Sequence, residues 1–271
     1  MAQTILITGA SSGIGKVTAK HFHDQGWNVI ATMRSPEKET ELSELNNVLV
    51  TRLDVLNGDT IDAAVAEGIE KFGRIDVLLN NAGYGAYGPL EAFPFDRIER
   101  QFDTNVLGLL AVTKAVLPHF RANKSGIVIN VSSIGGLMTF PLGTLYHGTK
   151  FAVEGISEAL HYELEAFGVK VKIVEPGMIR TDFGGRSFDF VNDETMEEYQ
   201  GTVQRLFAAW GNAGDNASDP EVVAEIIWQA ATDGTATLRY RAGADAEALL
   251  DARKAQDDAT FIGNMKAQMG L

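Results

Sequence analysis

The sequence predicts an α/β domain built on an open, doubly wound parallel sheet of seven strands with helices on both faces. Short apolar runs rich in β-branched residues alternate with longer amphipathic stretches over most of the chain. This alternation is typical of parallel strands that are buried on both sides. Right-handed crossovers between such strands distribute the helices over the two faces of the sheet. The 271 residues contain no linker, low-complexity tract or internal repeat, so a single domain over residues 1–271 is expected.

The expected elements follow one another in a regular order. Two regions depart from this alternation of strands and helices. Residues 182–218 are rich in Gly, Asp, Asn and aromatic residues without a clear strand, and we expect a variable substrate loop there. Residues 242–271 form an Ala-rich, charged tail that is expected to be helical. The predicted strands cover residues 3–8, 28–33, 48–53, 75–80, 126–131, 169–175 and 235–240, and the predicted helices cover residues 13–25, 37–45, 58–72, 96–121 and 145–167.

Composition narrows the range of partners. With 23 basic and 36 acidic residues the net charge is −13, which repels nucleic acid, so a small ligand is expected. The chain has no apolar run long enough to span a membrane and no basic start typical of a signal peptide. Zero cysteines and this start predict a cytoplasmic protein. The five histidines have no metal-ligand spacing, and no metal site is expected.

A glycine-rich turn follows the first predicted strand directly. It runs Gly9-Ala10-Ser11-Ser12-Gly13-Ile14-Gly15 and leads into a predicted helix. Glycines let the backbone approach a pyrophosphate, and the free N–H groups of a helix start attract the anion. The spacing differs from the common G-x-G-x-x-G fingerprint, and an ordinary glycine turn is the alternative.

The end of the second predicted strand decides which adenosine ribose fits. Arg34 and Ser35 stand there, and no acidic residue occurs before Glu37. An acid at this place accepts hydrogen bonds from a ribose 2′-hydroxyl, whereas an arginine pairs with a 2′-phosphate. We therefore predict NADP(H) in preference to NAD(H), with Arg34 as the phosphate clamp and Ser35 beside it. A solvated arginine is the alternative.

Further polar and small residues follow the next two strands. Asp54 and Val55 end the third, and Asn81-Ala82-Gly83 end the fourth. Ligands bind at these carboxyl ends in open α/β sheets. Asp54 could accept from an adenine amino group or act as a turn residue. Asn105 lies in an apolar helical stretch, where it either holds water or backbone, or has a core-polar or helix-bending role.

Three residues suggest proton-transfer chemistry. Tyr146 and Lys150 are four residues apart on a predicted helix, and Ser133 precedes the tyrosine by thirteen residues. Residues four apart share a helix face, so a lysine ammonium beside the phenol would lower its pKa from about 10 towards neutrality. Ser133 could then hold a carbonyl or carbinol oxygen. A solvated helix face is the alternative for the Tyr–Lys pair taken alone.

Together these blocks resemble the short-chain dehydrogenase/reductase family, whose fold is Rossmann-type. The matching residues span residues 4–181. The resemblance implies that Tyr146 is the general acid in reduction and the base in oxidation, with Ser133 orienting the substrate oxygen. It also implies that Lys150 tunes Tyr146 and holds the nicotinamide ribose, with Asn105 holding a water. Residues implied by the resemblance at the end of the match are Pro176, Gly177, Ile179 and Thr181, of which Thr181 would hold the nicotinamide carboxamide.

Within this family the chain looks most similar to 17β-hydroxysteroid- and retinol-dehydrogenase-like bacterial members. We therefore expect an NADPH-dependent carbonyl reductase or alcohol dehydrogenase acting on a bulky, apolar ketone or secondary alcohol. Alternatives are steroid- or retinol-type alcohol oxidation and a non-catalytic nucleotide sensor. The resemblance also implies a homodimer or homotetramer. Aromatic residues that could line the substrate pocket, or pack the segment onto the core, are Tyr84, Tyr87, Phe140, Phe183, Phe188, Phe190, Tyr199, Phe207 and Trp210.

Overall fold

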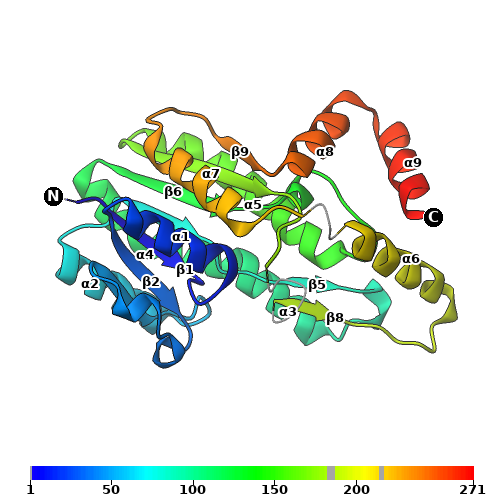
Figure 1. Cartoon of the computed structure of the whole chain (residues 1–271), viewed down its shortest axis with the longest axis horizontal. Helices are drawn as coiled ribbons and strands as arrows, with labels where there is room; N and C mark the ends of the chain where they lie inside the picture. The colour runs from blue at the N-terminus through cyan, green and yellow to red at the C-terminus, as the bar shows by residue number, and fades with distance from the viewer. Residues whose placement is uncertain (1, 182–186, 214–216) are drawn as a thin grey trace.

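The computed structural model describes residues 2–181, 187–213 and 217–271, and it confirms the predicted parallel sheet (Figure 1). The seven strands pair in parallel in the order β3-β2-β1-β4-β6-β7-β9. The strand order reverses between β1 and β4, and in such sheets ligands bind in the crevice outside the carboxyl ends at this point. The strands are β1 (Thr4–Thr8), β2 (Asn28–Met33), β3 (Val48–Arg52), β4 (Val77–Asn80), β6 (Gly126–Val131), β7 (Val169–Pro176) and β9 (Arg239–Ala242).

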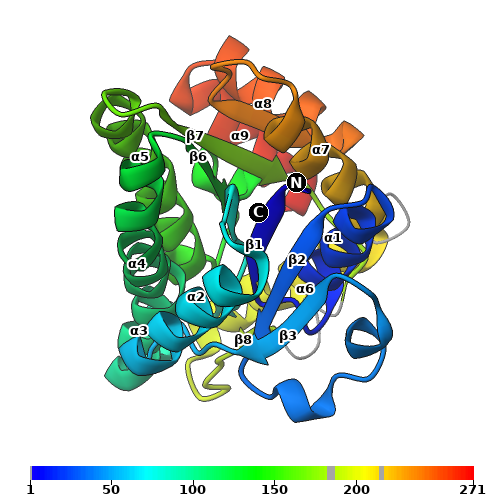
Figure 2. The same cartoon turned by 90° about the vertical axis from the view of Figure 1, so that its left-hand side faces the viewer.

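Two layers of helices cover the sheet, with α2, α4 and α5 on one face and α1 and α7 on the other (Figure 2). Each layer encloses an apolar core whose strand residues are almost completely buried. The apolar strands therefore contribute side chains to both cores, as the alternating pattern predicted. The covering helices are α1 (Gly13–Asp24), α2 (Gly58–Phe72), α4 (Gly108–Asn123), α5 (Thr144–Glu165) and α7 (Pro220–Thr232).

The predicted helix over residues 37–45 is wrong. Two short 3-10 turns, Pro36–Lys38 and Leu42–Glu44, occupy this stretch instead. The Glu39 carboxylate accepts hydrogen bonds from the backbone N–H groups of Glu41 and Leu42, both at 2.9 Å. A carboxylate that takes these donors replaces the carbonyl acceptors of a continuous helix.

The predicted helix over residues 96–121 is interrupted. It divides into α3 (Phe95–Phe102), a π-helical turn (Asp103–Leu107) and α4. At the junction the helix backbone lies so close to the chain after β3 that a Cβ on Gly108 would come within 2.7 Å of Val55 Cγ2. Such π turns occur frequently at functional sites, and this one contains Asn105.

The described residues between 187 and 213 contain regular structure that the sequence did not predict. They form a strand, β8 (Phe188–Phe190), which pairs in parallel with the equally unpredicted β5 (Gly85–Tyr87), and the helix α6 (Glu197–Ala213). Strands of three residues are too short for periodicity to reveal. The helix α7 was also missed, and the last strand begins four residues later than predicted because Asp233 forms a turn with Thr235 through a 2.9 Å hydrogen bond.

The C-terminal tail is helical, as predicted, and consists of α8 (Ala244–Ala255) and α9 (Asp258–Met269). Buried apolar residues of both helices pack against Ile134 and Met138, which follow β6. The tail thus lies against the edge of the sheet where the site residues gather. No helix in the described ranges is long and apolar enough to cross a membrane.

The aromatic contacts around Phe22 give a test of the core between α1 and α7. Its ring is fully buried and makes edge contacts with Trp27 and Trp228, each with ring centroids 5.1 Å apart. Phe22→Ala removes these contacts and leaves a cavity, so the free energy of unfolding should fall by about 3–5 kcal/mol in urea denaturation. Val222→Ala on α7, where the side chain is 40% exposed, is the control and should change it by less than about 0.5 kcal/mol. Equal effects of the two substitutions would contradict this packing.

Candidate active site

The glycine turn forms a concave backbone surface between β1 and α1. Gly9 and Gly13 have φ values of 71° and 51°, a region that side chains disfavour. A Cβ on Gly15 would lie 2.4 Å from the Gly9 carbonyl oxygen, so only glycine fits there. Ser12 precedes α1 without a side-chain cap, which leaves the first N–H groups of the helix available to an anion.

The residues after β4 fix this turn from the side. The Asn81 Nδ2 group donates to the carbonyls of Thr8 and Gly9 at 2.9 and 3.2 Å. Thr8 Oγ1 accepts from the backbone N–H groups of Asn81 and Ala82, both at 3.0 Å. The Asn81 amide therefore holds the protein backbone, while Ala82 Cα lies 3.0 Å from the position of a Cβ on Gly9. Small residues allow this close approach.

The ends of β2 and β3 lie next to the glycine turn in the sheet. Arg34 is exposed and forms no ion pair with any described residue. Ser35 is partly buried, and its side chain makes no cap hydrogen bond. Asp54 Oδ1 accepts from the Leu56 N–H at 3.1 Å, which is the turn role that the sequence left open. Its neighbour Val55 packs against Gly108.

Asn105 lies in the π turn, and its side chain is fully engaged by protein groups. Its Nδ2 donates to the Tyr84 carbonyl at 2.8 Å and to Thr149 Oγ1 at 3.1 Å, while Oδ1 accepts from the Tyr84 N–H at 3.1 Å. The amide therefore joins the loop after β4 to α5. Asn105 thus holds the backbone of Tyr84, which is one of the roles that the sequence left open.

Tyr146, Lys150 and Ser133 come together as predicted at the carboxyl end of β6. The Tyr146 phenol is hydrogen-bonded to the Ser133 hydroxyl, which also accepts from the Gly135 N–H at 3.0 Å. The Lys150 ammonium lies 5.7 Å from the centroid of the Tyr146 ring and donates to the Val131 carbonyl at 2.9 Å. Tyr146 and Lys150 are each 9% exposed. The Tyr–Lys pair is therefore buried and does not form a solvated helix face.

The protonation state of this pair differs from the expectation. Burial raises the pKa of Tyr146 to about 12, although the hydrogen bond with Ser133 acts in the opposite direction. The net direction is thus opposite to the predicted shift towards neutrality, because burial has the largest effect on Tyr146. Burial also lowers the pKa of Lys150 to about 8, against the attraction of the Glu154 carboxylate. Desolvation disfavours the charged form of both groups.

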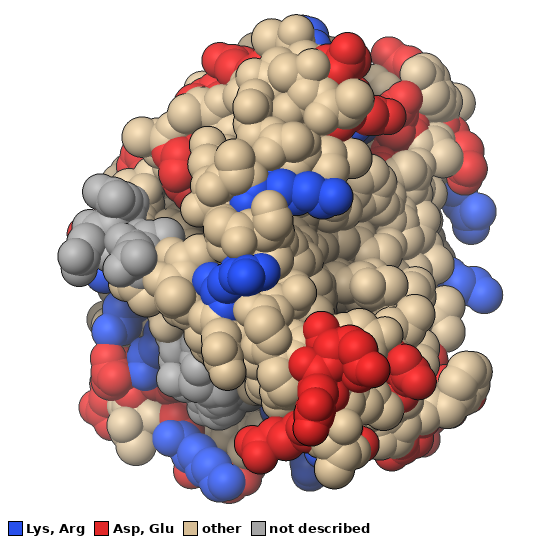
Figure 3. All heavy atoms as spheres, turned by 90° about the vertical axis from the view of Figure 1, so that its right-hand side faces the viewer, with Lys and Arg blue, Asp and Glu red and all other residues tan. Residues whose placement is uncertain are grey.

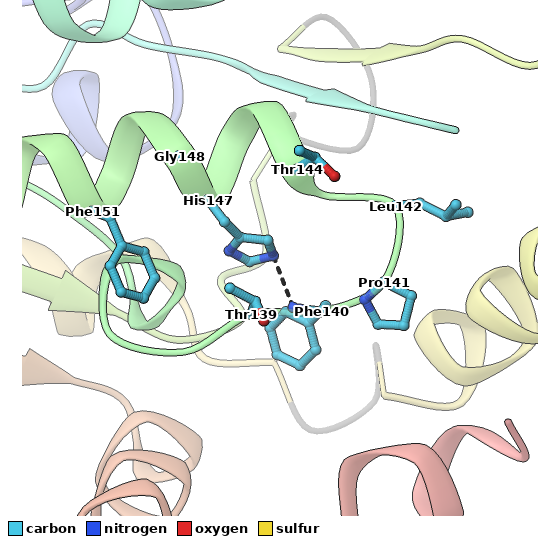
Figure 4. A pocket seen from close by; sticks show the side chains of 8 residues that line it. All are labelled: Thr139, Phe140, Pro141, Leu142, Thr144, His147, Gly148 and Phe151. Carbon is cyan, nitrogen blue, oxygen red and sulfur yellow. Dashed lines mark hydrogen bonds between the residues drawn. The ribbon is translucent and has the colours of Figure 1, made fainter. Parts of the chain in front are cut away.

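His147 has a role in the site that sequence reasoning missed. Its Nε2 accepts from the Phe140 N–H at 2.9 Å, so the proton is on Nδ1, which donates to the Gly135 carbonyl at 2.9 Å (Figure 4). Burial lowers its pKa, while the Gly135 bond acts against this. The neutral ring thus fixes the segment after Ser133 to α5. In the sequence, only the position of His147 next to Tyr146 could have indicated this role.

An open hollow of about 490 Å³ lies beside this histidine, between the loop before α5 and the helix itself (Figure 4). Tyr146 is not among its walls. They are formed by Thr139, Phe140, Pro141, Leu142, Thr144, His147, Gly148 and Phe151.

Aromatic residues from three elements gather beside Tyr146. The Tyr87 ring lies 5.4 Å from that of Tyr146 and 5.1 Å from that of Trp210 on α6. Phe188 also contacts both Tyr87 and Trp210, at 5.6 and 5.7 Å. We call Tyr87, Phe188, Phe190, Phe207 and Trp210 the aromatic cluster.

The other predicted pocket residues lie elsewhere or outside the described residues. Tyr199 donates to Glu91 at 3.1 Å, Tyr84 lies beneath the Arg100 guanidinium, and Phe140 contacts His147. Phe183 falls outside the described residues.

The loop after β7 closes the site. A Cβ on Gly13 would lie 3.5 Å from Thr181, so this loop meets the glycine turn. Ile179 forms an isolated bridge with Ser218. Pro176 ends β7, and Gly177 donates its N–H to the Ala242 carbonyl at 3.0 Å. The predicted residues from six strand ends are thus brought to one edge of the sheet, as parallel pairing requires. No cluster able to hold a metal ion occurs among the described residues.

Comparison with known proteins agrees with this geometry. The profile of the family described as short chain dehydrogenase matches residues 3–191. An uncharacterized oxidoreductase of Schizosaccharomyces pombe is 48% identical over 239 residues, covering 88% of this chain and all of the relative. Estradiol 17-beta-dehydrogenase 1 of Rattus norvegicus is 35% identical, covering 87% of this chain and 72% of its own.

Solved structures give the same result. A short-chain dehydrogenase from Streptomyces avermitilis superposes with a TM-score of 0.80 at 35% identity, covering 94% of both chains. ElxO with NADP bound superposes with a TM-score of 0.73 at 29% identity, covering 89% of this chain and 98% of its own. The chain belongs to the short-chain dehydrogenase family and is an NAD(P)-dependent oxidoreductase acting on CH–OH or C=O groups.

The raised pKa of Tyr146 can be measured directly. Because burial disfavours the phenolate, Tyr146 should stay protonated up to about pH 11 in the protein without added nucleotide. Titration of tyrosinate absorbance in wild type and in Tyr146→Phe should give curves that coincide up to pH 10. A tyrosinate signal present at pH 9 in wild type and lost in the variant would contradict this.

Proposed function

We propose that the protein is an NADPH-dependent carbonyl reductase that acts on bulky, apolar ketones. The observation that carries this proposal is the hydrogen-bonded pair of Tyr146 and Ser133 at the strand edge, next to a glycine turn that fits a dinucleotide. A hydroxyl pair of this kind suits a carbonyl oxygen on which negative charge develops.

The chain offers a binding surface for each part of NADP(H). The glycine turn and the start of α1 would hold the pyrophosphate, and the exposed Arg34 with Ser35 would hold the 2′-phosphate. Thr181, which lies against Gly13, would hold the carboxamide. The relative ElxO was solved with NADP bound, at 29% identity, which supports this choice. When bound, the cofactor supplies a hydride to the carbonyl carbon.

The residues around Tyr146 would supply the proton. Ser133 would orient the substrate oxygen, and Tyr146 would donate its phenolic proton to that oxygen as charge builds up. A pKa of about 12 keeps Tyr146 protonated at neutral pH, as a general acid requires. Lys150 would stabilise the phenolate that remains, from one helical turn away.

Alcohol oxidation is the second candidate. The relation to estradiol 17-beta-dehydrogenase 1, at 35% identity, favours it. In that direction Tyr146 has to accept a proton, and its high pKa makes the phenolate scarce at neutral pH. We therefore favour reduction. A protein that only senses the nucleotide would not need the Tyr146–Ser133 pair.

The aromatic cluster supports an apolar, uncharged substrate. It begins at Tyr87, beside Tyr146, and continues to Trp210 on α6, so it would cover a bulky group attached to the carbonyl. Figure 3 views the side of the molecule where α6 and α9 lie. Much of this face around a hollow is uncharged, with basic side chains beside the hollow and acidic side chains gathered below it.

We also propose that the protein is a cytoplasmic homo-oligomer. Support comes from apolar side chains exposed on α3, the π turn and α5. They lie on neighbouring elements along one side of the molecule (Figure 2), and exposed patches of this kind mark protein contacts. The residues are Phe95, Leu107, Phe151 and Tyr162.

Tyr146→Phe tests the assignment of the acid. Removing the hydroxyl should lower kcat for NADPH-dependent reduction of a bulky aryl ketone about a hundredfold or more. The dissociation constant for NADPH, measured by fluorescence titration, should change less than about twofold. Tyr162→Phe on the same helix, where the side chain is 71% exposed, is the control and should leave both unchanged. Turnover above one tenth of wild type in Tyr146→Phe would refute the acid role.

Arg34→Ala tests the choice of cofactor. Loss of a charge-assisted bond to the 2′-phosphate should lower kcat/KM for NADPH about tenfold to a hundredfold and leave kcat/KM for NADH unchanged. Lys38→Ala removes a neighbouring exposed cation and should change neither value by more than about twofold. A wild-type preference for NADH would overturn the assignment.

A further inference from the structure

The carboxylate of Asp245 joins the C-terminal tail to the loop after β7. Asp245 lies in the first turn of α8, and its Oδ2 accepts from the Met178 N–H at 2.6 Å. Met178 follows Gly177 at the start of the loop that ends at Thr181. No role for the tail was predictable from the sequence, and the proposed mechanism does not use this contact.

Two glycines leave room for this carboxylate. A Cβ on Gly177 would lie 2.3 Å from both carboxylate oxygens of Asp245, and a Cβ on Gly243 would lie 2.7 Å from Oδ1. Any side chain at either position would displace the carboxylate. The glycines thus form a niche that fits this one side chain.

The environment of Oδ1 is also unusual. This atom is buried and has no hydrogen-bond partner among the described residues. A buried, unpaired carboxylate oxygen is costly, and such costs are typically tolerated where function requires the group. The exposed Glu247, in the same turn of α8, pairs instead with Arg241 at 2.9 Å. The favourable effect of an acid at a helix start is therefore available without burying Asp245.

The loop is fixed on its other side as well. The Ser218 N–H donates to the Met178 carbonyl at 2.9 Å, and the Arg180 N–H donates to the Ser218 carbonyl at 2.8 Å. Between these bonds and Asp245, the backbone of Met178 is held at both its N–H and its carbonyl. Its position determines where Thr181 lies against the glycine turn.

We propose that Asp245 is a positioning residue, which sets the loop of residues 177–181 so that Thr181 meets the nicotinamide end of the cofactor. The proposal rests on the proposed function. The tail then acts on the cofactor site through the bond between Asp245 and the Met178 N–H. Loss of the Asp245 carboxylate should therefore weaken binding of the nicotinamide half of the cofactor and leave binding of the adenosine half unchanged.

Two ligands distinguish binding of the nicotinamide half of the cofactor from binding of the adenosine half. NADPH reports on the whole site, and adenosine 2′,5′-bisphosphate lacks the nicotinamide. In Asp245→Ala the dissociation constant for NADPH should rise about tenfold, because a bond to a charged group is lost. The dissociation constant for the bisphosphate should change less than about twofold. Asp245→Asn keeps an oxygen for the Met178 N–H, so its dissociation constant for NADPH should lie between those of Asp245→Ala and wild type. Glu247→Gln is the control for a charge at the start of α8, and its dissociation constants for both ligands should equal those of wild type.

A double substitution tests whether the Asp245 carboxylate lies directly against Gly177. Gly177→Ala should weaken NADPH binding because its methyl group displaces the carboxylate. In the Asp245→Ala background the same substitution should cost less, because the clash is gone. Unchanged NADPH affinity in Asp245→Ala, equal losses for both ligands, or additive effects in the double variant would each overturn the proposal. Failure of wild type to bind NADPH would refute the proposed function instead.

Discussion

The site depends on how closely α5 packs against the segment after β6. Three glycines make this approach possible. A Cβ on Gly135 or Gly143 would meet the His147 ring at 2.7 or 2.5 Å, and one on Gly136 would meet Ser132 Oγ at 2.6 Å. Since Ser133 lies on the segment and Tyr146 on the helix, this packing sets the distance between the two hydroxyls. The neutral His147 ring then fixes the segment with two hydrogen bonds.

The same packing explains the charge state of the site. Tyr146 and Lys150 are buried between α5 and the sheet, and burial disfavours the charged form of each. A protonated tyrosine can act as a general acid, whereas a phenolate is favoured by a positive charge close by. Burial therefore favours the protonated form of Tyr146 in the protein without nucleotide.

The sheet edge was predictable because most of its residues follow a recognisable apolar strand, whereas Tyr146, Lys150 and Asn105 lie on helical segments. Tyr146, Lys150 and Ser133 were brought together as expected. The pKa of Tyr146 was not predictable in this way, because spacing gives proximity to Lys150 but not burial. The bonds of Asn105 to the Tyr84 backbone depend on a π turn that periodicity does not reveal. The contact of Asp245 with Met178 joins residues 67 apart, and nothing local indicates it.

The central claim is that Tyr146 and Ser133 hold a ketone oxygen while a hydride reaches its carbon. It is tested most directly with NADPH that carries deuterium at both positions of the reactive carbon of the nicotinamide ring, together with a bulky aryl ketone. Mass spectrometry of the product should show an alcohol carrying one deuterium on its carbinol carbon. An alcohol without deuterium at that carbon, or no alcohol from any uncharged bulky ketone, would contradict the account.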